Sequence, residues 1–228
     1  MRKCTIMNSN TPRGGKDTSA NHMVELINSQ EGNLVAHKRN FKDKLIEATA
    51  TMLNISVEEF LEYYDTETKE VPKSYKEGSL DFVQQLHTHK HEWWKDVPMY
   101  YIGLKGFSKR QALIYCSETL FKPLLGKEVF GQMFVESLPE EGITFSGDGG
   151  FPDEAIPVIR ELGKENVLIV RITRDIESDV VDSRSLLKPE DFPPESCPCF
   201  LDVENSGSVE DLKRKVEEGV GAWMNENL

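Results

Sequence analysis

The sequence has no apolar run close to the roughly 18 residues that a membrane-spanning helix needs. Its 228 residues are 38% hydrophobic and 29% charged, so we expect a soluble chain with one sizeable core. Residues 1–7 show no long apolar segment followed by a small-residue cleavage site, so no secretory signal is expected. These absences predict a cytoplasmic protein without a membrane partner.

Basic residues are also scarce, because 27 lysines and arginines face 39 aspartates and glutamates and leave a net charge of −12. Proteins that bind polymeric nucleic acid usually present a broad basic surface, so we expect no such partner. Local basic clusters are present, for example Arg13 with Lys16 and Arg171 with Arg174. Such clusters suit a small polyphosphate ligand, although each could equally be solvated surface.

Cysteine is rare too, with four residues in the whole chain. Cys197 and Cys199 stand too close for an ordinary disulfide, and no Cys-x-x-Cys pair suggests a zinc site. We therefore interpret all four cysteines as structural thiols of a protein in a reducing compartment: Cys4, Cys116, Cys197 and Cys199.

Hydrophobic periodicity predicts an alternation of strands and helices. Expected strands cover residues 3–8, 34–36, 142–145, 167–172 and 199–203. Expected helices cover 16–29, 41–53, a short segment from 56, 79–94, 108–120, 127–137, 153–162 and 208–223, with a polar loop at 65–78. The alternation predicts a single α/β domain over residues 1–228, built as a parallel sheet with helices on both faces. The mainly helical region 56–140 would then form a substrate-covering insertion.

A glycine-rich loop lies directly between the first expected strand and helix. In the register of the P-loop pattern, Asn10 takes the first glycine position, Gly15 and Lys16 match, and Asp17 replaces the expected hydroxyl residue, with Thr18 next. Asparagine tolerates a left-handed backbone, so the turn can still form at Asn10. The strand-loop-helix context favours a phosphate-binding loop, and the alternative is an ordinary glycine-rich turn.

The physical basis of such a loop is the convergence of backbone amides and a helix N-terminus on phosphate oxygens. Here Gly14 and Gly15 would let the backbone approach the phosphates of ATP, and Lys16 would supply positive charge. At the start of the helix, Asp17 or Thr18 would hold Mg²⁺. The residue types predict ATP and Mg²⁺ as ligands.

The run from Arg13 to Thr18 resembles the Arg-x-Gly-Lys-Asp-Thr loop of the bacteriophage deoxynucleoside monophosphate kinases, a P-loop family related in fold to adenylate kinase. Residues 40–45, 117–127 and 148–154 are similar to that family in order and spacing. Gly150 departs from it, because related proteins often carry an arginine there. The resemblance implies a three-layer P-loop NTPase fold, ATP and a deoxynucleoside monophosphate (dNMP) as substrates, and the host cytoplasm as location if the chain is phage-encoded.

With this reaction in mind, Lys16, Arg13 and Arg110 are the expected catalytic residues. Lys42 and Arg110 each begin an expected helix and are candidates for the acceptor phosphate, with solvent-facing positions as the alternative. The two arginines after the strand 167–172, Arg171 and Arg174, could close over the phosphates or form surface ion pairs. Asp148 could orient Mg²⁺ or a nucleotide hydroxyl, or simply hold a turn.

Two other functions remain open on the sequence. The chain could be a kinase of another small metabolite, or a catalytically inactive nucleotide-binding module, which Asn10 and Gly150 make plausible. A hydroxyl acceptor would require a catalytic aspartate, whereas a phosphate acceptor requires additional cations. The oligomeric state is also open, with a homodimer as one option.

Overall fold

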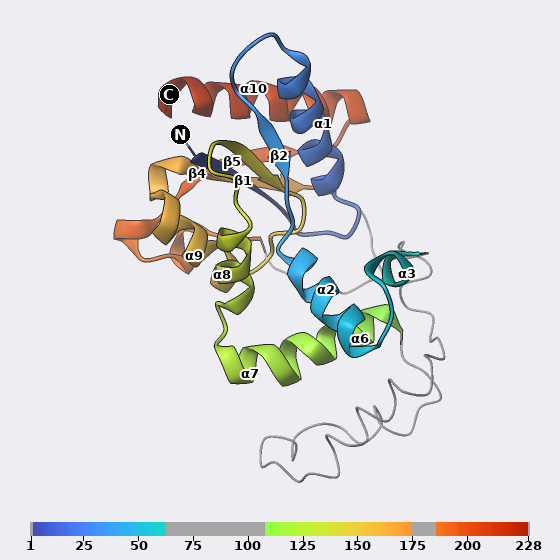
Figure 1. Cartoon of the computed structure of the whole chain (residues 1–228). Coiled ribbons are helices and arrows are strands. Elements are labelled where there is room, and N and C mark those ends of the chain that lie inside the picture. The colour runs from blue at the N-terminus through green and yellow to red at the C-terminus, as the bar shows by residue number, and fades with distance from the viewer. Residues whose placement is uncertain (1, 63–107, 175–185, 228) are drawn as a thin grey trace, which may run out of the picture. The chain divides into compact units, whose positions relative to one another are not determined.

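The computed structural model describes residues 2–62, 108–174 and 186–227. The expected helix 79–94 and the expected loop 65–78 lie outside these residues. The chain divides into two compact units, which are Met1–Phe41 with Phe130–Leu228, and Lys42–Val129. Each unit is described by itself below (Figure 1).

The first unit contains a five-stranded sheet in which every neighbouring pair of strands is parallel. Its strands are β1 (Arg2–Ser9), β2 (Ala36–Lys38), β3 (Gly142–Ser146), β4 (Val167–Thr173) and β5 (Cys199–Glu204), in the order β2-β3-β1-β4-β5. The central strand β1 is buried from its second residue onward, as expected for a parallel strand covered on both faces. The predicted α/β class and parallel sheet are confirmed.

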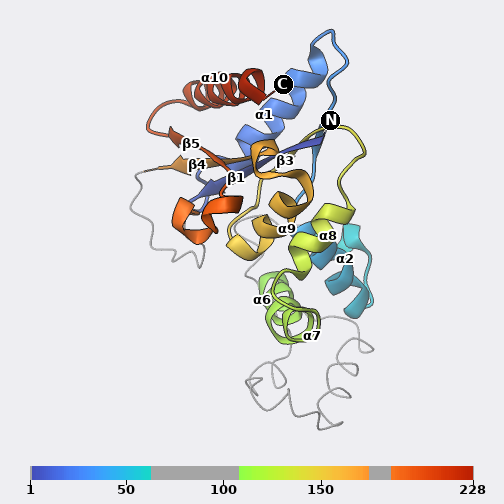
Figure 2. The same ribbon diagram turned by 90° about the vertical axis from the view of Figure 1, so that its left-hand side faces the viewer.

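Helices cover both faces of this sheet. One face carries α1 (Lys16–Ser29) and α10 (Val209–Asn227), and the other carries α8 (Val129–Glu136) and α9 (Pro152–Leu162) (Figures 1 and 2). After β1 the chain crosses one face through α1 to reach β2, and after β3 it crosses the other face through α9 to reach β4. In open α/β sheets, ligands bind at the carboxyl ends of strands whose connections diverge in this way. The loops after β1 and β3 are therefore the expected place for a site.

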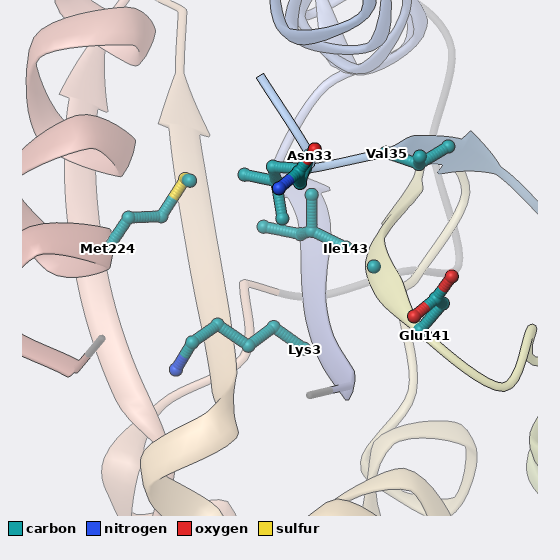
Figure 3. A pocket seen from close by; sticks show the side chains of 8 residues that line it. Lys3, Asn33, Val35, Glu141, Ile143 and Met224 are labelled. Atoms are coloured by element: carbon teal, nitrogen blue, oxygen red, sulfur yellow. The ribbon is translucent and has the colours of Figure 1, made fainter.

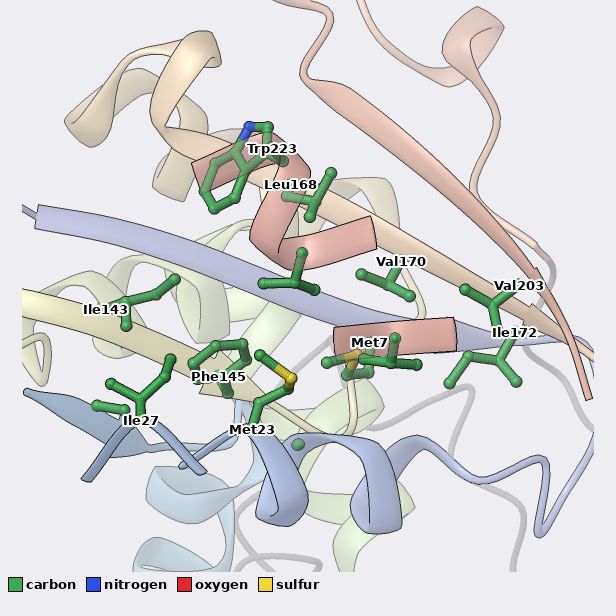
Figure 4. Close-up of a cluster of buried hydrophobic side chains, with 14 of the residues drawn as sticks. Met7, Met23, Ile27, Ile143, Phe145, Leu168, Val170, Ile172, Val203 and Trp223 are labelled. Atoms are coloured by element: carbon green, nitrogen blue, oxygen red, sulfur yellow. The ribbon is translucent and has the colours of Figure 1, made fainter. Parts of the chain in front are cut away.

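The core beneath α1 and α10 fixes how the sheet and these helices pack (Figure 4). Met7, Phe145 and Val170 are fully buried on this face, and Met23 of α1 packs against them. Alternate residues of β1, such as Ile6, enter the second core under α9. Because each fully buried apolar side chain contributes roughly 1.5–3 kcal/mol, the core beneath α1 and α10 holds α1 in a defined position over the sheet.

The ends of these elements follow from local sequence. Pro152 opens α9, where its missing N–H costs nothing, and Gly163 ends it with φ of 86°. The strand β2 starts at Ala36, later than the expected 34–36, because Leu34 and Val35 remain 37% and 43% exposed beside the edge of the sheet. Apolar residues at an edge need not be buried, so hydrophobicity alone placed this strand too early.

The second unit is helical in its described part. Its elements are α2 (Lys42–Met52), α3 (Val57–Leu61), α6 (Lys109–Tyr115), a π-helical segment (Cys116–Phe121) and α7 (Lys122–Leu125). Phe60 is fully buried within it against α2 and α6 residues. The π-helical segment ends at Phe121, two residues before Pro123, whose nitrogen has no proton to donate to the helix. This unit overlaps the expected insertion 56–140, and its role in covering a substrate stays a prediction.

Among the described residues, no helix is both long enough and apolar enough to cross a membrane.

Candidate phosphate-binding loop

The loop between β1 and α1 has two residues with positive φ, Arg13 at 58° and Gly15 at 102°. Gly15 is also the N-cap of α1, and it has no side chain with which to cap the first amides of the helix. These amides and the positive end of the helix dipole are the usual components of an anion site. The left-handed residue that the sequence suggested at Asn10 is found at Arg13 instead.

Three backbone carbonyl groups of the loop accept hydrogen bonds from other groups of the protein. The backbone N–H of Gly14 donates to the carbonyl of Thr11 at 3.3 Å, and Nδ2 of Asn205 donates to the carbonyl of Gly14 at 3.0 Å. Arg174 donates to the carbonyl of Arg13 at 3.4 Å. Because these carbonyls point toward protein donors, they do not crowd an anion with their negative ends.

Both glycines of the loop are closely packed, and Gly15 also has a φ of 102° that other residues rarely adopt. A Cβ on Gly14 would lie 2.0 Å from Oγ of Ser9, and a Cβ on Gly15 would lie 2.5 Å from Cδ2 of Leu212 in α10. Real Cβ atoms do not approach so closely, so larger residues would displace the loop. The neighbours of both glycines here are protein side chains, so the prediction that they let the backbone approach phosphate stays a prediction.

Three cationic residues of the prediction occur at this loop. Lys16 is the first residue of α1 and is 8% exposed, whereas Arg13 is exposed. Arg174 follows β4 and reaches the loop through the carbonyl of Arg13. The first unit therefore brings Arg13, Lys16 and Arg174 to one end of the sheet.

The two predicted metal ligands lie in the first turn of α1. Thr18 is exposed, and the carboxylate of Asp17 is 66% exposed with Oδ1 at 3.2 Å from Nζ of Lys38. The same ammonium donates to Oδ1 of Asn21 at 2.7 Å. Side-chain oxygens of Asp17 and Asn21 thus contact the ammonium group of Lys38. Carboxylate and amide oxygens are also the kind of ligand that Mg²⁺ binds.

Asp148 lies after β3 and is 9% exposed. Its Oδ1 accepts hydrogen bonds from the backbone N–H of Phe41 and from Oγ of Ser146, each at 2.9 Å. The turn-holding alternative for Asp148 is therefore observed. A second role at a substrate or metal stays a prediction.

Arg171 is held within the sheet. Its guanidinium forms two hydrogen bonds of 2.6 Å with the carboxylate of Asp202 on the neighbouring strand β5, and lies 5.1 Å from the ring centre of Phe200. Charge-assisted bidentate pairs of this kind are among the stronger side-chain contacts. Arg171 thus has an ion-pair partner in this structure, whereas Arg174 contacts the loop.

Lys42 and Arg110 belong to the second unit. Lys42 is the first residue of α2, and Arg110 lies in the first turn of α6 behind a capping box formed by Ser108 and Gln111. Their expected contact with an acceptor phosphate stays a prediction.

The four cysteines are free thiols, as expected. Burial raises the pKa of Cys4 well above its usual value, and burial raises the pKa of Cys116 to about 11. The described residues contain no cluster of three or more His, Cys, Asp or Glu side chains able to hold a metal. Cys4 and Cys116 therefore have the properties of structural thiols.

A pocket of about 230 Å³ lies at the other end of the sheet, near the amino ends of β1 and β3 (Figure 3). Its lining includes Lys3, Val35, Glu141 and Met224. The ammonium of Lys3 already donates to Oδ1 of Asn166 at 3.0 Å, and burial lowers the pKa of Lys3. We favour the loop over this pocket as the candidate site, because ligands of parallel α/β sheets gather at the carboxyl ends of strands.

The side chains that sequence reasoning missed are the ones that support the loop from elsewhere in the chain. Asn205 lies between the last expected strand, 199–203, and the last expected helix, 208–223, and neither Ser9 nor Asn21 was singled out. The available signal was position, because Asn205 directly follows the last strand of a predicted parallel sheet. Comparison with known proteins adds nothing to this picture, since no family model and no curated protein matches the chain.

Proposed function

We propose that this chain is an ATP-dependent kinase that converts a deoxynucleoside monophosphate into its diphosphate in the cytoplasm. The observation that carries the proposal is the loop from Asn10 to Lys16, which has a lysine at the start of α1. The carbonyls of Thr11, Gly14 and Arg13 in this loop accept hydrogen bonds from the Gly14 N–H, Asn205 and Arg174, respectively.

The residue assignments follow from charge. Lys16 and Arg13 would bind the β- and γ-phosphates of ATP through amides and cations, and Arg174 is close enough to the loop to assist them. Mg²⁺, held by Asp17 or Thr18, would neutralise charge on the phosphates. The oxygen pair of Asp17 and Asn21, which holds an ammonium group in this structure, supports that assignment.

The reaction itself requires little from the protein besides alignment. A phosphate oxygen of the acceptor forms a bond to the γ-phosphorus, the bond from that phosphorus to the β,γ-bridging oxygen breaks, and ADP leaves. A phosphate acceptor is already anionic near neutral pH because its second pKa is about 6, so no strong base is needed. Positioning and charge neutralisation supply the rate enhancement, with Lys42 and Arg110 as candidates at the acceptor.

The resemblance of Arg13–Thr18 to the loop of bacteriophage dNMP kinases selects this acceptor class. A kinase of another metabolite and an inactive nucleotide-binding module remain the two other functions. The burial of Asp148 and its two hydrogen bonds at 2.9 Å favour a structural over a basic role, and therefore a phosphate over a hydroxyl acceptor.

The test incubates the purified full chain with ATP, Mg²⁺ and each of the four dNMPs and measures ADP. We expect ADP with at least one dNMP. In Lys16→Ala the loss of a charge-assisted contact of about 1.5–3 kcal/mol should weaken ATP binding roughly 10- to 150-fold. Lys44→Ala is the matched control, because Lys44 is an exposed lysine paired with Glu47.

The outcomes separate the three functions. ATP binding without ADP formation would favour the inactive module. Asp148→Asn keeps Oδ1 as an acceptor for the Phe41 N–H, so a loss of several orders in kcat in this variant would favour a hydroxyl acceptor. If ATP does not bind, or if Lys16→Ala binds it as tightly as the unchanged chain, the loop is not a nucleotide site.

A further inference from the structure

Lys38 connects the end of β2 to the start of α1. Its Nζ lies 2.7 Å from Oδ1 of Asn21 and 3.2 Å from Oδ1 of Asp17, and its side chain is only 25% exposed. Asp17 and Asn21 are four residues apart and so lie on the same face of the helix. A single ammonium group is therefore held between two oxygens of α1.

We propose that Lys38 is a built-in cation that occupies the metal position of the loop until a divalent cation displaces it. The inference rests on the proposed function in one respect, which is that Asp17 serves as the metal ligand. Lys38 then sets the concentration of Mg²⁺ at which the loop becomes loaded.

The chemistry of the donors supports this exchange. Carboxylate and amide oxygens are ligands for Mg²⁺, and they are also acceptors for a lysine ammonium group. A divalent ion and an ammonium group on the same carboxylate oxygen would repel each other at a separation of a few ångströms. Loading of Asp17 with metal therefore requires that Lys38 leave this oxygen.

The surroundings of Asp17 restrict how it can bind both cations at once. A Cβ on Gly147, at the end of β3, would lie 2.5 Å from Oδ1 of Asp17, so that oxygen packs against the backbone of the next strand. The backbone N–H of Gly147 in turn donates to Oδ1 of Asn40 at 3.3 Å, and this hydrogen bond helps to fix the segment that follows β3. Oδ1 of Asp17 thus lies close to the backbone of Gly147 on one side and to Nζ of Lys38 on another, although the carboxylate as a whole is 66% exposed.

An alternative is that the pair merely joins β2 to α1 as a surface ion pair. The two interpretations differ in what happens to a metal when Lys38 is removed. If Lys38 competes with the metal, metal binding tightens, and because pairs this exposed are weak we expect a gain of about two- to fivefold. If Lys38 only joins two elements, metal affinity changes only through the general loss of a positive charge, and that change persists when Asp17 is replaced.

The experiment titrates Mn²⁺ into the nucleotide-free full chain and follows paramagnetic broadening of the backbone amide signals of residues 17–21. Lys38→Met should bind Mn²⁺ about two- to fivefold more tightly than the unchanged chain, and Lys44→Met, which removes another paired lysine, should bind as the unchanged chain does. In the background Asp17→Asn, the additional change Lys38→Met should produce no gain.

Two results would overturn the inference. One is an unchanged Mn²⁺ affinity in Lys38→Met, provided that thermal unfolding shows the variant to be folded. The other is a gain that persists in the Asp17→Asn background. Because the titration uses no nucleotide, its failure is separate from that of the kinase proposal, which the ADP measurement decides.

Discussion

We expect the substitution Asn205→Ala to lower both the stability of the chain and its affinity for ATP. The Nδ2 of Asn205 donates to the carbonyl of Gly14 at 3.0 Å in a buried position. Removing the donor leaves this carbonyl without its partner, at a cost of about 1–3 kcal/mol. For a chain of 228 residues, each kcal/mol corresponds to roughly 2–4 °C in Tm, so a decrease of about 2–12 °C is expected.

The effect on ATP has the same origin. Without Asn205, the loop can recover a hydrogen bond by turning the carbonyl of Gly14 toward water, and ATP binding must then reverse that rotation. The cost of reversal is at most the same 1–3 kcal/mol, which corresponds to a roughly 5- to 150-fold weaker Kd as an upper limit. In Asn205→Asp an oxygen would replace the donor at nearly the same shape, so this variant should bind ATP at least as weakly as the alanine variant.

The measurement combines thermal unfolding with calorimetric titration of ATP, and Asn28→Ala is the matched control. Asn28 exchanges two hydrogen bonds of 2.9 Å with the backbone of Ala36, away from the loop. Its replacement should lower Tm by a similar amount and leave the Kd for ATP unchanged. If Asn205→Ala loses stability yet binds ATP normally, or if Asn205→Asp behaves as the unchanged chain does, the proposed anchoring of the loop is wrong.

Two further predictions follow from titratable groups. Burial raises the pKa of both Cys4 and Cys116, the latter to about 11, so these thiols should react with a disulfide reagent at pH 8 only after unfolding. The partly exposed Cys197 and Cys199 should react in the folded chain. Rapid reaction of all four thiols without denaturant would contradict this. At the start of α10, the hydroxyl and backbone N–H of Ser208 donate to Asp211 and lower its pKa below the usual 3.8. The stabilisation is therefore present above pH 3.8 and is lost as the pH falls through the lowered value, so Asp211→Asn should reduce the acid dependence of chemical unfolding, and an unaltered dependence would exclude this cap.

The sequence predicted the elements of the first unit well because their signals are local. The buried runs at β1 and β4 and the 3.6-residue period of α1 are each visible within a short window. The order of the strands is not visible in this way, because parallel pairs join segments that are far apart in the chain. Lys3 pairs with Ile143, for example, and only the folded sheet shows this register.

The residue types of the candidate loop could be recognised in the sequence, but the residues elsewhere in the chain that hold the loop in place could not. Glycines followed by a lysine identify the loop, since each has an intrinsic backbone or charge property. Which non-glycine residue of the loop adopts the left-handed conformation depends on how the chain enters α1, and it is Arg13 with φ of 58°. Similarly, Arg171 and Arg174 look equivalent in the sequence, but alternation along β4 directs Arg171 to Asp202, whereas Arg174, beyond the strand, reaches the loop.

The position of these supports explains why a loop so near the amino end depends on residues near the carboxyl end. Because all five strands are parallel, their carboxyl ends meet at one edge, and segments after β4 and β5 therefore reach the loop after β1. A loop that is already held by such contacts loses less conformational freedom when an anion binds, so more of the interaction energy appears as affinity. If the loop binds phosphate as proposed, anchoring by Arg174 and Asn205 would offset the absence of a glycine at Asn10, because these two side chains fix the loop backbone at Arg13 and Gly14.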